Sequence, residues 1–345
     1  MIVPGAASQN RIEACPESSR RSARILGLGS ALPGRVLTNA DLETIIDTSD
    51  EWIVSRTGMK KRHVVGPSES TGTLAVTAAR RALEDAEVSA DCIDVIIIAT
   101  ITPDQPCPAT ACKVQAAIGA TRAIGFDLAA ACTGFVNALA VASSMIQSGA
   151  AEKVLVIGAD TLSTITDYES RDSCILFGDG AGAAVIGADS EGPELLDLSL
   201  GMDGRGYETI GVPAGGSALP ASEATLRERQ HFLRLDGREV FRFAVQKLVG
   251  TVKELAERNG VAVADLDHIV PHQANLRILE AAAKKLGLPL DRFVIQIEEV
   301  GNTSAASVPM ALDSAARAGR IEKGDLVALV AFGGGLTWGG ALFQW

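Results

Sequence analysis

The stretch GFDLAAACTGFVNALAVASSMIQSGAAEKVLVIGAD, residues 125–160, contains in order a short apolar run, a turn of small residues, an alanine-rich segment and a second apolar run. A later stretch, FVIQIEEVGNTSAASVPMALDSAARAGRIEKGDLVALVAF, residues 293–332, repeats this order. Apolar runs that alternate with helical segments predict βαβ units, in which helices cover both faces of a largely parallel sheet. The pair of stretches therefore predicts an α/β fold with two similar halves.

A weaker repeat supports the same organisation. Residues 82–100 and 253–273 each contain a helical segment, a short loop with aspartates and an apolar run. Apolar residues also recur at helical spacing over 240–258, before an Asn-Gly pair that ends the helix. We expect an N-terminal half over residues 24–192 and a C-terminal half over 193–345, with the duplicated turns facing each other.

Charge and hydrophobicity exclude two classes of partner. The 345 residues include 31 Lys and Arg against 42 Asp and Glu, which gives a net charge of −11. Such a chain lacks the broad basic surface that general nucleic-acid binding requires. Its longest strongly apolar run, residues 95–101, is far shorter than the roughly 18 residues of a membrane-spanning helix. We expect no nucleic-acid or membrane partner, and a local basic patch wherever a phosphate is bound.

The N-terminus and the cysteines point to an intracellular protein. Residues 1–23 lack the central apolar block of a secretory signal, and we interpret them as a mobile leader. The cysteines form no CxxC pair and no metal-ligand spacing, so we expect reduced thiols, a cytoplasmic location and no metal site. The six are Cys15, Cys92, Cys107, Cys112, Cys132 and Cys174.

Cys132 is the candidate nucleophile. It follows a predicted strand and precedes the alanine-rich helix, with Gly134 two residues further on. The positive end of a helix favours a thiolate, which predicts a pKa below the usual value of about 8.5. A thiolate in that position is a nucleophile. A structural cysteine buried at the start of a helix is the alternative.

Two further polar residues stand at the ends of predicted core elements. His272 follows the strand-like HIVP and is the one histidine of four at the carboxyl end of a predicted core strand, where ligands bind in open α/β sheets. Asn302 lies in the turn that repeats the Cys132 turn. An imidazole and an amide aimed at one point suit a developing enolate, because neither adds negative charge beside it. A structural histidine is the alternative.

The segment AFGGGLTWGG, residues 331–340, is rich in glycine after an apolar run. It predicts either a tight turn or a backbone N–H presented without obstruction by a side chain. In the second case this N–H and that of Cys132 would form an oxyanion hole for a thioester intermediate.

Six segments together resemble the β-ketoacyl-acyl-carrier-protein synthase III family, the condensing enzymes that initiate bacterial type II fatty acid synthesis. The resemblance is colinear from about Arg24 to Trp345. It implies the thiolase fold, with two duplicated α/β halves in five αβαβα layers, and a homodimer. The segments are TSDEWIVSRTGMKKRH (48–63), FDLAAACTGF (126–135), LFGDGAGAAV (176–185), PHQANLRI (271–278), GNTSAASVP (301–309) and AFGGGLTWG (331–339).

The resemblance also implies a reaction. Cys132 would take an acyl group from acyl-CoA, and malonyl-acyl carrier protein would then enter. His272 and Asn302 would stabilise the enolate formed by decarboxylation, which attacks the acyl-Cys132 thioester to give 3-oxoacyl-carrier protein, CO₂ and CoA. Gly334, matched to the family's loop, would donate one oxyanion-hole N–H beside that of Cys132. No metal or redox cofactor would be required.

The resemblance places three residues at a CoA entrance, namely Trp52, Arg56 and Arg171, the first and last on either side of the adenine. An indole and a guanidinium can stack on a base, and arginine pairs with phosphate. Without the surrounding motif, a core tryptophan and solvated arginines would be the simpler interpretation.

Two more expectations concern the carrier protein and the primer. Arg277, Lys284 and Lys285 would receive an acidic carrier protein, although the lysines also fit an ordinary charged helix face. Cys107 matches a position where the partner subunit contributes a bulky residue, often Phe, to the acyl pocket. Each extra methylene buried is worth about 0.8 kcal/mol, so the smaller Cys107 predicts primers longer or more branched than acetyl.

Several alternatives stay open. Type III polyketide synthases and alkylquinolone-type condensing enzymes share a Cys/His/Asn set, and some relatives transfer acyl groups to a hydroxyl or amine instead. A thiolase is disfavoured because residues 331–340 lack its second cysteine. A non-catalytic subunit of a heterodimer is disfavoured because Cys132 is present.

Overall fold

Nine strands make up the main sheet of the computed structural model, which describes residues 21–188 and 191–345. The sheet consists of two parts that share one pairing, Arg24 with Glu194. The first part has the order β1-β7-β6-β4-β5 and the second the order β8-β13-β12-β11. Their bounds are β1 (Arg24–Ala31), β4 (Val95–Ala99), β5 (Ile124–Leu128), β6 (Lys153–Thr161), β7 (Asp179–Gly187), β8 (Glu194–Met202), β11 (His268–Pro271), β12 (Leu326–Gly333) and β13 (Thr337–Gln344).

The expected parallel pairing holds only for the strands nearest the helical crossovers. β4 pairs in parallel with β5 and β6, and β11 pairs in parallel with β12. The other neighbours are antiparallel. β13 follows β12 through a tight turn, which allows only antiparallel pairing, and the connection from β6 to β7 contains only the short helix α6 and a 3₁₀ turn.

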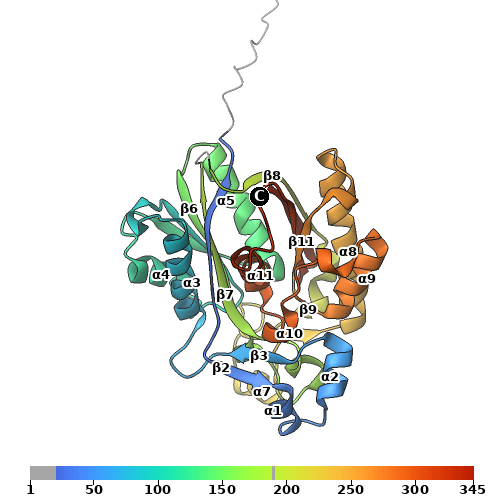
Figure 1. The fold of residues 1–345 in the computed structure, drawn as a ribbon. Helices are drawn as coiled ribbons and strands as arrows, with labels where there is room; N and C mark the ends of the chain where they lie inside the picture. Colours follow the sequence, from blue (N-terminus) through green and yellow to red (C-terminus); the bar gives the residue numbers. More distant parts are fainter. Residues whose placement is uncertain (1–20, 189–190) are drawn as a thin grey trace, which may run out of the picture.

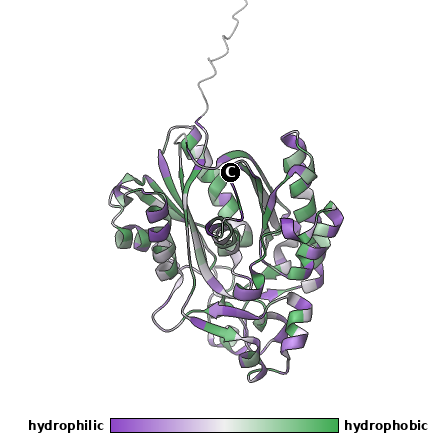
Figure 2. Ribbon diagram, viewed as in Figure 1, coloured by the Kyte–Doolittle hydropathy of each residue, from purple (hydrophilic) through white to green (hydrophobic). Residues whose placement is uncertain are grey.

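Helices cover both faces of each part of the sheet, so the chain has five layers in the order αβαβα (Figure 1). Figure 2 shows the apolar residues concentrated where these layers meet. α3 (Thr71–Asp85) and α4 (Thr110–Ile118) form one outer layer, and α8 (Gly237–Arg258) and α9 (Leu276–Leu286) form the other. The middle layer contains α5 (Gly134–Gln147) and α11 (Ser307–Arg317).

Helix α8 shows how well a local pattern predicts an element. The apolar period predicted a helix over 240–258, and the structure has one over Gly237–Arg258. The start lies three residues earlier because the Asp236 carboxylate accepts hydrogen bonds from the N–H groups of Arg238 and Glu239.

Short elements gather at one end of the layers (Figure 1). These elements are β2 (Arg35–Thr38), α1 (Asn39–Glu43), α2 (Asp50–Thr57), β3 (Lys61–Val64), α6 (Arg171–Cys174), β9 (Ile210–Gly211), α7 (Glu223–Arg227), β10 (Arg234–Leu235) and α10 (Ile297–Val300). Most of them share a core that includes Leu42, Ile53, Met59 and Ile297, whereas β9 and β10 contribute to a separate small cluster with Leu162, Phe177 and Leu233.

Arg62 is fully buried in this region. Its guanidinium donates to the carbonyl oxygens of Leu37 and Ile175 and to Oδ1 of Asn39, at 2.8 to 3.3 Å. Burial lowers the pKa of Arg62 to about 10. Three segments that are distant in sequence are thus held by one cation.

Replacing Arg62 with methionine is expected to destabilise the protein by about 3 kcal/mol or more, because three buried acceptors lose their donor at about 1–3 kcal/mol each. Urea unfolding of Arg62→Met would measure this, with the exposed Arg35→Met as the control. Unchanged or increased stability would mean that the desolvation penalty of the buried Arg62 charge equals or exceeds the stabilisation from its hydrogen bonds.

The two duplicated turns have the same local geometry and touch each other. A 3₁₀ turn at Ala131–Thr133 leads into α5, and one at Ser304–Ala306 leads into α11. Ala131 and Ser304 both have left-handed backbones, with φ of 47° and 49°. A Cβ added at Gly134, where the first turn enters α5, would lie 3.3 Å from the Ala305 Cβ of the second turn. The second turn also packs on β6: the N–H of Ala305 donates to the buried Asp160, and a Cβ added at Gly158 would lie 2.2 Å from the Ala305 carbonyl oxygen. The sequence is therefore restricted to small residues where the turns meet.

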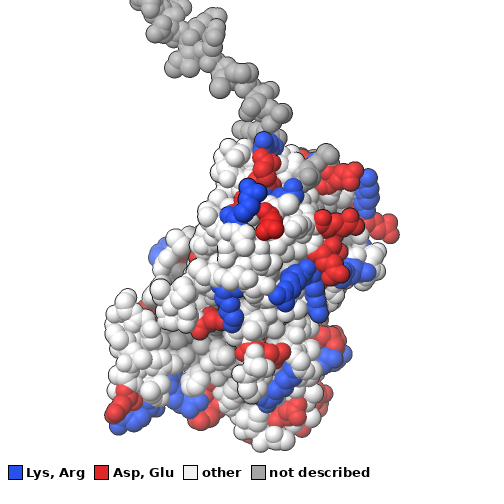
Figure 3. Space-filling model, turned by 90° about the vertical axis from the view of Figure 1, so that its left-hand side faces the viewer, with Lys and Arg blue, Asp and Glu red and all other residues white. Residues whose placement is uncertain are grey.

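The expectations of no nucleic-acid partner and no membrane partner can be compared with the surface charge and the helices. Figure 3 shows Lys and Arg intermixed with Asp and Glu on one face, without a continuous basic area. Within the described ranges, no helix is both long enough and apolar enough to span a bilayer. The expected mobile leader, residues 1–23, lies almost entirely outside the described residues.

Candidate active site

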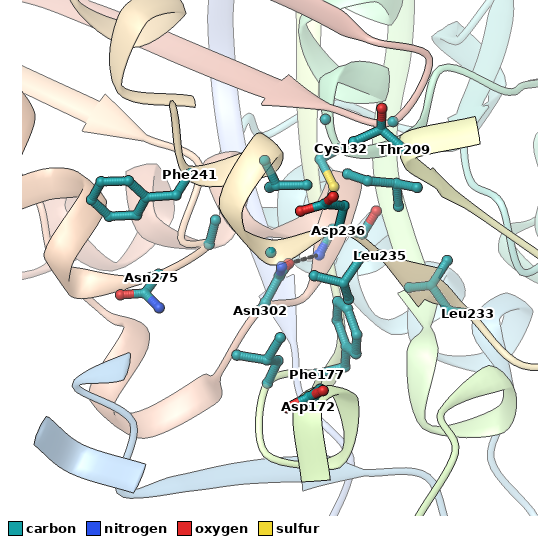
Figure 4. Close-up of a pocket in the computed structure, with 18 of the residues that line it drawn as sticks. Cys132, Asp172, Phe177, Thr209, Leu233, Leu235, Asp236, Phe241, Asn275 and Asn302 are labelled. Carbon is teal, nitrogen blue, oxygen red and sulfur yellow. Dashed lines mark hydrogen bonds between the residues drawn. The ribbon is translucent and has the colours of Figure 1, made fainter. Parts of the chain in front are cut away.

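A cavity of about 940 Å³ brings together residues from widely separated parts of the chain. In Figure 4 the Cys132 sulfur and the Asn302 side chain both point into it, near apolar side chains such as Leu233 and Leu235. Six of the residues singled out from the sequence line this cavity: Trp52, Arg56, Cys132, His272, Asn302 and Gly334.

Cys132 lies in the first of the two turns, one residue after the left-handed Ala131. Burial raises the pKa of its thiol to about 12. The expectation of a lowered pKa is wrong, because the loss of solvation outweighs the favourable helix end. The free protein therefore holds Cys132 as a thiol, and the proton must leave as the sulfur attacks.

Asn302 lies in the second turn, and its backbone is fixed by the segment that follows α6. Its N–H donates to Leu176 and its carbonyl accepts from Gly178, each at 2.9 Å. A Cβ at Gly178 would lie 2.2 Å from the Val300 carbonyl oxygen, so only glycine permits this approach. The Asn302 Oδ1 accepts the N–H of Ser304 at 2.9 Å, which leaves its NH₂ group as a donor to the cavity.

His272 follows the end of β11, and its N–H donates to Val330 at 2.7 Å. Its ring packs edge-on against Phe332, with centroids 5.3 Å apart. Burial lowers the pKa of His272 to about 3, so the imidazole is neutral at physiological pH. The next residue, Gln273, was missed by sequence analysis; its buried amide bonds to Pro271 and Val294 and fixes the turn.

The depressed pKa of His272 predicts a specific loss of stability in acid. Below the unfolded value of 6.5 the unfolded chain takes up a proton that the folded chain excludes until about pH 3. Between pH 6 and pH 5 we expect wild type to lose about 1 kcal/mol relative to His272→Gln in denaturant titrations. Parallel stability curves for the two proteins would contradict a neutral His272.

The glycine-rich loop joins β12 to β13 beside the nucleophile. Gly334 lines the cavity, as expected. The closest approach is at Gly333, however, where an added Cβ would lie 2.8 Å from the Cys132 Cβ and 3.1 Å from its sulfur. At Gly334 the nearest atoms would be 3.5 Å away, an ordinary contact. The sequence predicted an unobstructed backbone N–H as one of two interpretations of this glycine run, but it did not indicate that Gly333 lies against the nucleophile.

The expected base-stacking group gathers at the cavity entrance. The Arg56 and Arg171 guanidinium carbons lie 5.2 and 4.7 Å from the centre of the Trp52 ring. Arg171 does not itself line the cavity. Because the Arg171 guanidinium is already at stacking distance from the indole, an inserted base would have to separate the two.

A second hollow of about 710 Å³ adjoins the first and shares lining residues with it, including Arg56, Arg238 and Asn275. We call this arginine-lined hollow the mouth. Arg56, Arg238, Arg242 and Arg277 line it, with two acidic residues. Arg238 and Arg242 were not predicted from the sequence; they are four residues apart at the start of α8 and therefore share one face.

Three expected residues are not brought to these hollows. Lys284 and Lys285 are exposed in the last turn of α9, whereas Arg277 is in its first turn. Cys107 is exposed and is not among the described residues that line either hollow of its own chain.

Comparison with known proteins agrees with this geometry. Residues 126–204 match the model of 3-oxoacyl-[acyl-carrier-protein] synthase III, and residues 256–345 match the model of its C-terminal region. The chain is 49% identical over 324 residues to the β-ketoacyl-[acyl-carrier-protein] synthase III of Caldanaerobacter subterraneus subsp. tengcongensis, covering 94% of this chain and 98% of the relative. The chain belongs to the β-ketoacyl-[acyl-carrier-protein] synthase III family.

Solved structures of the synthase III family have the same fold. The 3-oxoacyl-(acyl carrier protein) synthase III of Pseudomonas aeruginosa PAO1 is 44% identical, covers 94% of this chain and 98% of its own, and has a TM-score of 0.87. The priming β-ketosynthase of the R1128 polyketide biosynthetic pathway is 37% identical, covers 94% and 97%, and has a TM-score of 0.86. The predicted thiolase fold is confirmed, and the chain is a condensing enzyme of the acyltransferase class.

The hydrogen-bond donors described above suit the stabilisation of an oxyanion. Within the described residues, no group of three or more His, Cys, Asp or Glu side chains is arranged to hold a metal ion.

Proposed function

We propose that this chain condenses an acyl-CoA primer with malonyl-acyl carrier protein and so starts fatty acid synthesis. The products are 3-oxoacyl-acyl carrier protein, CO₂ and CoA. The observation that supports this most is the convergence of Cys132, His272 and Asn302 in one cavity beneath an arginine-lined mouth. The cavity thus combines a nucleophile with two uncharged groups that can donate hydrogen bonds.

In the first step, the Cys132 sulfur attacks the carbonyl carbon of the acyl-CoA thioester. The N–H groups of Cys132 and Gly334 stabilise the resulting oxyanion. When the intermediate collapses, the bond to the CoA sulfur breaks, and CoA leaves with the proton that the Cys132 thiol lost. Apolar side chains such as Phe177 and Leu233 surround the acyl group.

In the second step, the malonyl group loses CO₂, and the electron pair of the broken C–C bond forms an enolate. Asn302 and His272 donate hydrogen bonds to the enolate oxygen, and neither transfers a proton. The enolate carbon then attacks the acyl-Cys132 carbonyl, which releases the thiolate. Because the carbanion comes from C–C cleavage, we propose that neither a metal nor a redox cofactor takes part.

Recognition of the two substrates is assigned to the entrance. Trp52 and Arg171 would separate to hold the adenine, and Arg56 would pair with phosphate. Arg277, with Lys284 and Lys285 further along α9, would receive the acidic carrier protein. The structure adds Arg242 as a second guanidinium beside Arg277 in the mouth.

Charge reversal at the mouth provides a test of carrier-protein docking. We expect Arg242→Glu combined with Arg277→Glu to raise KM for malonyl-acyl carrier protein at least tenfold, while malonyl-CoA used as a surrogate is affected less. The effect on the carrier protein should shrink at high salt. Lys284→Glu with Lys285→Glu tests the other proposed docking residues, which lie outside the hollow, and we expect a smaller increase in KM. An equal increase would place the docking site further along α9.

We further propose a homodimer in the cytoplasm. β5 is an edge strand of the sheet, and Ile124 and Phe126 on it are 64% and 37% exposed. An exposed apolar edge strand favours pairing with another chain. The partner's Cys107 would then reach the acyl pocket, and its small side chain would admit primers longer or more branched than acetyl.

The two halves are proposed as units of the fold, with residues 24–192 and 193–345 as their limits. The pairing of β8 with β13 supports this division, because the chain joins the second part of the sheet at Glu194.

Product analysis with purified carrier protein tests the proposed reaction. Wild type is incubated with malonyl-acyl carrier protein and acetyl-, C4–C8 or branched acyl-CoA. We expect a 3-oxoacyl product and CO₂, with C4–C8 or branched primers faster than acetyl. Equal or faster turnover of acetyl-CoA would refute the primer assignment, and acyl transfer without CO₂ would refute condensation.

A role in a specialised pathway is the second candidate. It is supported by the 37% identity to the polyketide-priming β-ketosynthase. Carrier proteins of fatty acid synthesis and of polyketide synthesis can be compared as co-substrates; a clear preference for the latter would favour the second candidate.

A further inference from the structure

The His272 ring has a single hydrogen-bond partner in the part of the chain that the structure describes. Its Nδ1 lies 2.6 Å from Oγ of Ser307, and both residues are 1% exposed. Ser307 is the first residue of α11, five positions after Asn302. The segment that carries Asn302 therefore also supplies the hydrogen-bond partner of the His272 Nδ1 atom.

The Ser307 hydroxyl has one proton and two nearby acceptors. Besides His272 Nδ1, the carbonyl oxygen of Ser304 lies 2.8 Å from Oγ. That carbonyl already accepts the backbone N–H of Ser307. It therefore remains hydrogen-bonded when the hydroxyl turns away, and the proton is free for the imidazole.

The direction of this hydrogen bond decides what His272 can do in the cavity. A neutral imidazole carries one N–H. When Ser307 donates to Nδ1, the ring proton is on Nε2, on the opposite side of the ring. When the ring proton is on Nδ1, Nε2 is only an acceptor and cannot stabilise an enolate oxygen.

Asn302 is oriented by the same segment. Its Oδ1 accepts the Ser304 N–H, so its NH₂ group is the part left for the cavity. Residues 304–307 thus set the orientation of both polar side chains through one backbone N–H and one hydroxyl.

We propose that Ser307 is a positioning residue whose hydroxyl donates to Nδ1 of His272 and so holds Nε2–H toward the enolate oxygen. The inference rests on the proposed function, which requires a donor at that point. The enolate oxygen receives the electron pair released with CO₂ and accepts the Nε2–H hydrogen bond, and the proton stays on His272. Ser307 itself contacts no substrate.

The first test separates the two half-reactions. We expect Ser307→Ala to lower the rate of malonyl-acyl carrier protein decarboxylation at least about tenfold, with KM little changed, because the Nε2–H donor loses its support. Acylation of Cys132 by acyl-CoA, followed by intact mass, should remain within about threefold of wild type. Ser143→Ala, a buried serine in α5 that accepts a hydrogen bond from Gln147, is the matched control for loss of a hydroxyl.

The second test reads the His272 tautomer directly, and its deciding measurement is made on wild type. In ¹⁵N-histidine-labelled protein, the His272 signals are assigned by their absence from His272→Asn. We expect the proton on Nε2 in wild type and a mixture of tautomers in Ser307→Ala. A wild-type proton on Nδ1, or wild-type decarboxylation by Ser307→Ala, would overturn the inference. Failure of wild type to decarboxylate malonyl-acyl carrier protein would instead refute the proposed function, and the tautomer would still be measured.

Discussion

Replacing Cys132 by alanine is expected to lower the rate of 3-oxoacyl product formation on the order of 10⁴-fold, because no covalent acyl intermediate can form. A factor of this size corresponds to about 5.5 kcal/mol of activation free energy. Incubation with acyl-CoA followed by intact mass should show no acyl adduct on the variant. Decarboxylation of malonyl-acyl carrier protein should persist, since its donors are His272 and Asn302.

Cys92→Ala is the control for this variant, because Cys92 is an exposed cysteine remote from the cavity lining. It should retain wild-type condensation. If Cys132→Ala still acquires a stoichiometric acyl adduct, another residue is the nucleophile. If Cys132→Ala also loses the decarboxylation of malonyl-acyl carrier protein, then acyl loading and decarboxylation do not depend on separate residues.

Gly333→Ala is expected to lower kcat/KM for acyl loading on the order of 10²-fold. The new methyl group would lie 2.8 Å from the Cys132 Cβ and 3.0 Å from its backbone nitrogen, so the nucleophile or the loop must move. Displacement of a reacting group by about 1 Å is enough for a loss of this size. Stopped-flow measurement of acyl loading would quantify it.

Gly334→Ala is the matched comparison. It keeps the proposed oxyanion-hole N–H, and its methyl group would meet only ordinary contacts from 3.5 Å outward. We expect its loss to be at least about tenfold smaller than that of Gly333→Ala. Equal losses would show that flexibility of the whole loop matters more than the contact with Cys132.

Much of the fold could be predicted because its signals are local. The helix at α8, the strands on either side of α5 and the repeated order of elements follow from short-range apolar periodicity and caps. Pairing direction was only partly predictable, since the antiparallel strands β7 and β13 have no crossover helix, and their apolar runs look like those of parallel strands.

The central residues of the site could be predicted from the sequence, but their burial, their pKa values and their neighbours in space could not. Cys132, His272 and Asn302 each follow a recognisable strand or repeated turn, and the structure places all three at one cavity. The pKa of Cys132 was predicted in the wrong direction, because desolvation depends on surrounding atoms from both halves of the chain. Arg242 was missed because its partners in the mouth come from other segments.

The sequence by itself determined the α/β class, the duplication, the family and the identity of the three central polar residues, since these depend on the order and spacing of residues along the chain. Only the tertiary structure decided that Gly333 touches the nucleophile, that burial keeps Cys132 a thiol and that Ser307 contacts the back of His272. These properties depend on distances of a few ångströms between residues up to about 200 positions apart. Such distances are set by the packing of the two turns against each other and against the ends of β11 and β12.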